Sequence, residues 1–158
     1  MHNDYLEVIS LVERIHRYIL EVIKIELERL GSRDINNVQA MMLFNIGDAE
    51  MTIGELTLRG CYMGTNVTYN AKKLVESGYL EYQRSHHDRR SVYVRLTTKG
   101  HELRDKLNEM HERNVKLLHQ SGIGDTDLTA ALLTLHRFER LWMQATDLAS
   151  RQRQFIAA

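Results

Sequence analysis

The side chains best suited to a chemical role lie in residues 65–73, where hydrogen-bonding groups are followed by cations. Threonine and asparagine can hydrogen-bond to base edges in the major groove of B-DNA, where each base pair presents a distinct donor and acceptor pattern. Lysines beside them are suited to phosphates, which set register without reading sequence. The alternative is a solvated helix surface. The candidate DNA-contacting residues are Arg59, which precedes this segment, and Thr65, Asn66, Thr68, Tyr69, Asn70, Lys72 and Lys73 within it.

A second basic cluster lies in residues 84–91, a polar stretch between two strand-like segments. An arginine at such a hairpin tip can enter the minor groove, where a narrow A·T-rich groove concentrates negative potential. We predict this role for Arg90; the alternative is an ordinary polar turn. The candidate DNA-contacting residues of this cluster are Arg84, Asp88, Arg89 and Arg90.

The net charge of zero, with 21 basic and 21 acidic residues in 158, hides an uneven distribution. Residues 59–99 contain eight Lys and Arg but three Asp and Glu, a net charge of +5, whereas residues 1–58 have a net charge of −5. A basic block is expected where one part of a chain faces phosphate and the rest faces water. Because such patches also arise by chance on solvated surfaces, the block needs a matching shape.

Two short helices are predicted around the polar segment. Thr52, with Glu55 three residues later, forms a capping box that opens a helix of about two turns, and Gly60 ends it. The next helix is expected over residues 64–76, where Gly78 can close it with a positive φ. These helices form a helix-turn-helix. Alternating residues then predict strands over 79–83 and 92–96, a hairpin whose tip is the basic cluster.

Long helices are predicted on both sides of this core. Apolar residues spaced by four and three indicate a first helix over 5–30, and Gly31 follows it. A short helix capped by Asn36 or Asn37 should run to residue 46, and another should begin after residue 97. Asp125 or Thr126 is expected to cap the last helix. The first and last helices carry more apolar surface than one winged domain can cover, which favours a dimer over a monomeric bundle. The expected inner face of the helix after residue 97 consists of Leu103, Leu107, Met110 and Leu117.

Three segments resemble the MarR family of bacterial transcriptional regulators: residues 66–80 (NVTYNAKKLVESGYL), 88–91 (DRRS) and 96–100 (LTTKG). The specific part is Asp-x-Arg, formed by Asp88 and Arg90, a fixed distance before Leu-Thr-x-x-Gly. The resemblance implies a mainly α fold with a small β-hairpin wing, in a single domain over 1–158. Residues 35–100 would form the winged helix-turn-helix core, and residues 1–34 and 101–158 the dimerisation helices. It also implies that Asp88 pairs with Arg90 and holds it for insertion.

Within the family, residues 37–48 (NVQAMMLFNIGD) and 56–76 look most like the regulators of L,D-transpeptidase genes, the LdtR group. Tyr69 and Asn70 depart from the commonest family pattern, in which hydrophobic and basic residues are more usual. The operator sequence therefore does not follow from the resemblance.

The resemblance implies three partners: double-stranded DNA with a pseudo-palindromic operator, a second copy of the chain, and a small-molecule effector. In a two-fold dimer the two recognition helices are expected about 34 Å apart, one turn of DNA. The effector would bind between the dimer helices and the winged core and shift the spacing of the reading heads. The alternative for the side chains named next is plain core. The candidate pocket residues are Tyr18, Met41, Met42 and Phe44.

The sequence contains no P-loop, Gly-x-Gly-x-x-Gly, Gly-x-Ser-x-Gly or His-Glu-x-x-His motif, so we expect neither an enzyme nor a cofactor. Eight histidines and Cys61 leave open a metal- or redox-responsive regulator, although Cys-x-x-Cys is absent. A winged-helix adaptor that binds protein is the other alternative. No apolar run approaches the roughly 20 residues of a membrane span, and a single cysteine fits a reducing compartment. We therefore expect a soluble, cytoplasmic protein.

Overall fold

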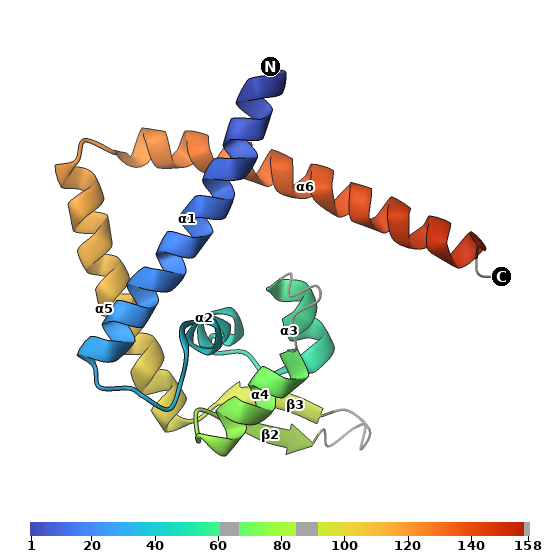
Figure 1. Cartoon of the computed structure of the whole chain (residues 1–158). Helices are drawn as coiled ribbons and strands as arrows, with labels where there is room; N and C mark the ends of the chain where they lie inside the picture. Colours follow the sequence, from blue (N-terminus) through green and yellow to red (C-terminus); the bar gives the residue numbers. More distant parts are fainter. Residues whose placement is uncertain (61–66, 85–91, 157–158) are drawn as a thin grey trace. The chain divides into compact units, whose positions relative to one another are not determined.

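The computed structural model describes residues 1–60, 67–84 and 92–156, with side chains up to residue 147 apart from those of Arg84 and Val92. The fold is mainly helical with one small antiparallel sheet (Figure 1), which confirms the expected class. The chain forms two compact units, Met1–His111 and Glu112–Ala158. The described elements are α1 (His2–Arg29), α2 (Asn37–Ile46), β1 (Met51–Thr52), α3 (Ile53–Arg59), α4 (Val67–Glu76), β2 (Leu80–Arg84), β3 (Val92–Leu96), α5 (Thr98–Gln120) and α6 (Asp125–Ile156).

Local capping chemistry sets the helix boundaries. Asn36 caps α2: its Oδ1 accepts the backbone N–H of Gln39 at 2.8 Å, while its own N–H donates to Gln39 Oε1 at 3.1 Å. This confirms the cap predicted before α2, and Gly31 follows α1 with a φ of 71°. The last helix differs from the prediction. The Asp127 carboxylate reaches back to the N–H of Gly124 at 2.9 Å, so neither Asp125 nor Thr126 is the capping residue.

The sheet has the order β1-β3-β2, with β3 in the centre and both pairings antiparallel. Met51 lies opposite Val94 and Leu80 opposite Leu96, and all four side chains are buried. The sequence predicted the β2–β3 hairpin but not β1. Two residues are too few for alternation to reveal a strand, and β1 exists only because β3 supplies its partner.

One hydrophobic core holds the helix-turn-helix within the Met1–His111 unit. It receives side chains from α1, α2, α3, α4, α5 and the sheet. Full burial of each large aliphatic side chain stabilises the folded state by about 1.5–3 kcal/mol. The buried side chains of α3 and α4 therefore hold these helices firmly against the core. The largest fully buried side chains are Ile23, Met42, Leu43, Ile46, Leu56, Leu74, Leu80, Val94 and Leu107.

The inner face of α5 is shorter than predicted. Leu103, Leu107 and Met110 are buried, whereas Leu117 is 60% exposed. Leu117 lies about two helical turns beyond Met110, past the end of the first unit and its core. Among the described residues, no helix combines the length and the apolar character that crossing a membrane requires.

Candidate nucleic-acid interface

The first helix of the helix-turn-helix, α3, is fixed at its start and along its buried side. Thr52 Oγ1 accepts the N–H of Glu55 at 3.2 Å, and the N–H of Thr52 donates to Glu55 Oε2 at 2.7 Å. This is the predicted capping box, and the donated hydrogen bond holds the pKa of the Glu55 carboxyl below its usual range. Leu56 is fully buried, while Arg59 lies exposed at the C-terminal end of α3. The helix therefore carries one exposed cation to the start of the turn.

The second helix, α4, has one buried and one exposed face. Val67, Ala71 and Leu74 are at most 4% exposed and form the buried stripe. Tyr69 is 53% exposed, and Thr68 is also exposed. A hydroxyl, a phenol and a lysine pair thus project from a helix whose opposite side is locked into the core. A helix with this surface fits the major groove and can hydrogen-bond to base edges.

The two lysines on α4 share one carboxylate. Lys73 Nζ lies 2.8 Å from Glu76 Oε2 and Lys72 Nζ lies 3.9 Å from Glu76 Oε1. Glu76 raises the pKa of Lys73, so this side chain stays charged. Exposed ion pairs of this kind contribute little to stability, because water and salt screen the two charges. Both lysines can therefore exchange Glu76 for a phosphate at little cost.

Asn70 differs from its neighbours because it faces α2. Its side chain is half-buried, and its Oδ1 accepts a hydrogen bond from Gln39 Nε2 at 3.2 Å. Gln39 is only 7% exposed. The capping-box spacing from Asn36 to Gln39 could have revealed the role of Gln39 in α2, but no local pattern indicates Asn70 as its partner.

Two cations of the basic block bind carboxylates elsewhere in the fold. Arg95 Nε lies 2.5 Å from Glu81 Oε1, and Arg95 Nη1 lies 3.1 Å from Glu50 Oε1. Lys99 Nζ lies 2.7 Å from Asp34 Oδ2 and 4.1 Å from the centre of the Tyr79 ring. Counting charges along the sequence therefore overstates the positive charge that this block offers to phosphates.

The wing is described through its strands. Arg84 pairs with Val92 at the end of the β2–β3 ladder, so Arg84 is the last residue of β2 and not, as was predicted, part of the polar stretch between the strands. The remaining predicted contacts of the turn and the wing, and the side chain of Arg84, lie outside the described residues. The predicted site residues outside the described part are Thr65, Asn66, Asp88, Arg89 and Arg90.

The four side chains predicted for an effector pocket lie in different surroundings. Met42 is fully buried in the core, whereas Tyr18 is 72% exposed on α1. Met41 and Phe44 pack against the core, and the Phe44 ring meets His111 edge-on with 5.1 Å between centroids.

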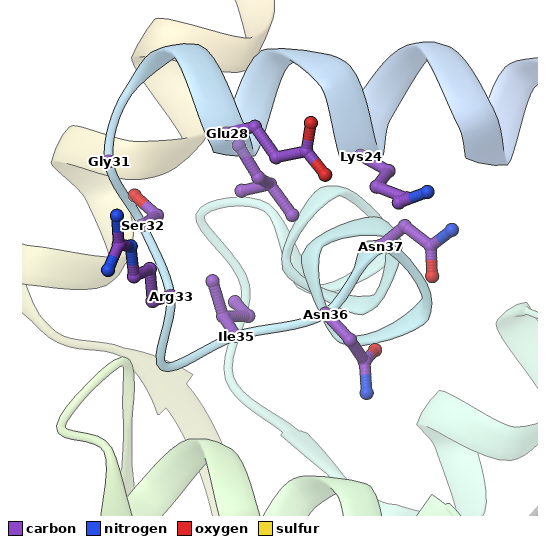
Figure 2. A pocket seen from close by; sticks show the side chains of 9 residues that line it. Lys24, Glu28, Gly31, Ser32, Arg33, Ile35, Asn36 and Asn37 are labelled. Carbon is purple, nitrogen blue, oxygen red and sulfur yellow. The ribbon is translucent and has the colours of Figure 1, made fainter.

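A pocket of about 470 Å³ lies between the end of α1 and the start of α2 (Figure 2). Figure 2 shows Lys24 and Glu28 projecting from α1 toward the start of α2, where Asn37 lies. The Asn37 amide donates to the carbonyl oxygen of Leu20 at 3.0 Å and ties α2 to α1 at the pocket edge. The lining residues are Lys24, Leu27, Glu28, Gly31, Ser32, Arg33, Ile35, Asn36 and Asn37.

The metal- and redox-responsive alternatives rest largely on residues outside the described part, namely His86, His87 and Cys61. Within residues 1–60, 67–84 and 92–156, no three His, Cys, Asp or Glu side chains are grouped so that they could hold a metal ion.

A capped first helix, a second helix with a polar exposed face and a following β-hairpin define a winged helix-turn-helix protein of the DNA-binding class. Residues 35–100 match the family model described as a winged helix DNA-binding domain. The chain is 36% identical over 141 residues to the exopolysaccharide II synthesis transcriptional activator ExpG of Rhizobium meliloti, covering 89% of this chain and 73% of ExpG.

Solved structures share the fold. Streptococcus pneumoniae FabT, crystallised in complex with DNA, matches with a TM-score of 0.69 and 24% identity, covering 89% of this chain and 98% of FabT. AbsC, a MarR family transcriptional regulator from Streptomyces coelicolor, matches with a TM-score of 0.71 and 15% identity, covering 91% of this chain and 97% of AbsC. The chain belongs to the MarR family of winged-helix transcriptional regulators and is a DNA-binding regulator. Its homologues are regulators of transcription, not enzymes.

Proposed function

We propose that this regulator binds a pseudo-palindromic operator as a homodimer, with the exposed face of α4 reading bases in the major groove. The observation that carries the proposal is the division of α4 into a locked apolar stripe and an exposed face. That face presents Thr68 and Tyr69 beside Lys72 and Lys73. Hydroxyl groups can bond base edges, and the lysines supply phosphate contacts that fix register.

The predicted contacts outside the described residues, together with Arg59 and Arg84, would complete this interface. Thr65 and Asn66 would extend base reading toward the start of the recognition helix, and Arg59 would contact phosphate. Arg90, held by Asp88, would enter the minor groove. Arg84 and Arg89 would add positive charge for phosphate contacts near Arg90.

Dimerisation is supported by the apolar surface that the terminal helices leave uncovered. On α1, Ile15 is 47% exposed and Val12 43%, and on α6, Trp142 is 46% exposed. Each helix carries several such residues at helical spacing, and large exposed apolar patches mark interaction sites. A two-fold dimer would cover them and place two α4 helices on successive turns of one duplex face.

The effector that the family resemblance implies has a candidate place in the pocket between α1 and α2. The charged lining residues of this pocket are Lys24, Arg33 and Glu28, and its side-chain amides are those of Asn36 and Asn37. This lining suits a small polar or amphipathic molecule. The pocket includes Asn36, which caps α2, and α2 contacts α4 through Gln39. Binding there can therefore bias the position of the recognition helix.

Two sets of target genes follow from likeness to other regulators. The LdtR-like stretches over residues 37–48 and 56–76 favour L,D-transpeptidase genes, whereas the identity with ExpG favours exopolysaccharide synthesis genes. Sequencing the genomic fragments that the protein retains decides between them.

The proposal is tested by selecting duplexes from a randomised library with the purified protein. We expect two inverted half-sites with centres about 10–10.5 base pairs apart. We also expect an affinity that falls steeply with salt, because each neutralised phosphate adds about −0.9 to the slope of log K against log salt. Enrichment of an unrepeated site would contradict the two-fold arrangement, and salt-independent retention would contradict phosphate contacts.

A further inference from the structure

A hydrogen bond between two amide side chains connects α2 to the recognition helix. Gln39 Nε2 donates to Asn70 Oδ1 at 3.2 Å, although the two residues are 31 positions apart in sequence. Gln39 is 7% exposed and Asn70 is half-buried. A buried amide that loses its hydrogen-bond partner lowers the stability of the fold. Breaking this hydrogen bond should therefore cost more free energy than breaking a similar one on the surface.

The orientation of the Gln39 amide is set before it meets Asn70. Its Oε1 accepts the backbone N–H of Asn36 at 3.1 Å, and the Gln39 N–H donates to Asn36 Oδ1 at 2.8 Å. With the oxygen used in the cap of α2, the NH₂ group faces Asn70. Asn37, the next residue, is bonded to the carbonyl oxygen of Leu20 on α1 at 3.0 Å. The donor thus rests on a cap that is itself fastened to α1.

Asn70 lies where α4 changes from its exposed to its buried face. Tyr69 on one side is 53% exposed, and Ala71 on the other is fully buried. Apolar packing holds α4 against the core, but the hydrophobic effect has no preferred direction. A hydrogen bond has a preferred direction and distance, and therefore resists rotation of the helix about its own axis.

We propose that Gln39 is a positioning residue for base reading: through its hydrogen bond to Asn70, it sets the rotation of α4 and so the placement of Thr68 and Tyr69 against base edges. This rests on the proposed function of α4. Side chains that read bases must be held to within about 0.5 Å, so a small rotation of α4 would displace Thr68 and Tyr69 from base edges.

The competing assignment is that Asn70 itself contacts a base. The two differ in what Gln39 can do, because a side chain 7% exposed on α2 does not reach DNA. A change of base preference that substitutions of Gln39 and Asn70 share would therefore act through the hydrogen bond between them.

The experiment uses the full-length protein, a duplex that the wild type selects from a randomised library, and its single-base-pair variants. Dissociation constants are measured for the wild type, Gln39→Met, Asn70→Leu and the double variant, each shown by circular dichroism to be folded at the assay temperature. Both substitutions keep side-chain size and remove one amide. The matched control is Thr52→Ala, which removes the hydrogen bond that caps α3 but keeps the hydrogen bond between Gln39 and Asn70.

We expect Gln39→Met and Asn70→Leu to change the relative affinities at the same base positions by about tenfold, the size of one misplaced base contact. The double variant should change them no more than the larger single variant, because the bridge can be removed only once. Thr52→Ala should lower the melting temperature and leave base preference unchanged, because the cap of α3 takes no part in the bond between Gln39 and Asn70.

A changed preference in Asn70→Leu but not in Gln39→Met would assign Asn70 to a base and overturn the inference. Equal weakening on every duplex, or no effect from either substitution, would also overturn it. Melting temperatures of the same four proteins test the bridge without DNA: losses that simply add would refute it. If the wild type selects no duplex, the proposed base reading by α4 is wrong. The melting temperatures of the four proteins still test the hydrogen bond between Gln39 and Asn70, so the two failures can be told apart.

Discussion

Gly100, in the first turn of α5, is the position where a single added methyl group has the clearest expected effect. A Cβ there would fall far inside contact distance of the carbonyl oxygen of Tyr79 and 3.0 Å from Leu96 Cδ2. The Tyr79 carbonyl accepts the N–H of Thr97 at 3.1 Å, so it cannot move away without straining the junction between the wing and α5. This close approach is the physical reason for the glycine in the Leu-Thr-x-x-Gly motif.

The magnitude follows from two opposed effects. Overpacking a well-filled site costs about 1–3 kcal/mol, and a clash with backbone belongs at the upper end. Alanine is better than glycine inside a helix by about 0.5–1 kcal/mol. Gly100→Ala should therefore lower the free energy of unfolding by about 1–2 kcal/mol, which shifts the melting temperature of a chain this size down by about 2–8 °C.

The assay is thermal unfolding followed by circular dichroism at one fixed protein concentration, because the melting temperature of an oligomer depends on concentration. Gly54→Ala in α3 is the matched control: the nearest atom to its added Cβ is Thr52 Oγ1 at 3.8 Å. The control should melt at or above the wild-type temperature. If Gly100→Ala does the same, the close packing of the start of α5 against Tyr79 and Leu96 is refuted.

Four further outcomes are expected. Lys72→Ala should reduce the slope of log K against log salt by about 0.9, one phosphate contact, in fluorescence-anisotropy titrations; an unchanged slope would remove Lys72 from the interface. Arg90→Ala should weaken binding to all duplexes while leaving the melting temperature unchanged, and unaltered affinity would contradict the wing assignment. Lys99 donates a hydrogen bond to Asp34 and lowers the pKa of that carboxyl, so the stabilisation is complete above about pH 4 and is lost as pH falls through the lowered native pKa. Urea unfolding should show Asp34→Asn less stable than the wild type at pH 7 and equal to it near pH 2; a difference that persists in acid would contradict this. Ile15→Glu should yield monomers in light scattering if α1 lies in the dimer interface, and a retained dimer would place the interface elsewhere.

Much of the interface could be predicted from sequence because its signals are local. The capping box at Thr52, the polar composition of α4 and the hairpin flanking the basic cluster each involve residues a few positions apart. Asn70 could not be assigned in this way. Its amide side chain suits a base contact, but in the structure its Oδ1 accepts a hydrogen bond from Gln39 on α2.

What the sequence alone determined are the features decided within about one helical turn: the caps at Asn36 and Thr52, the glycine after α1, and the alternation in β2 and β3. Tertiary structure decided which charged side chains form ion pairs with residues distant in sequence. Arg95 pairs with Glu50 and Lys99 with Asp34 only after folding. It also decided the existence of β1 and the orientation of Asn70. These depend on partners 31 or more positions distant, and no local periodicity encodes a contact that the packing of separate elements creates.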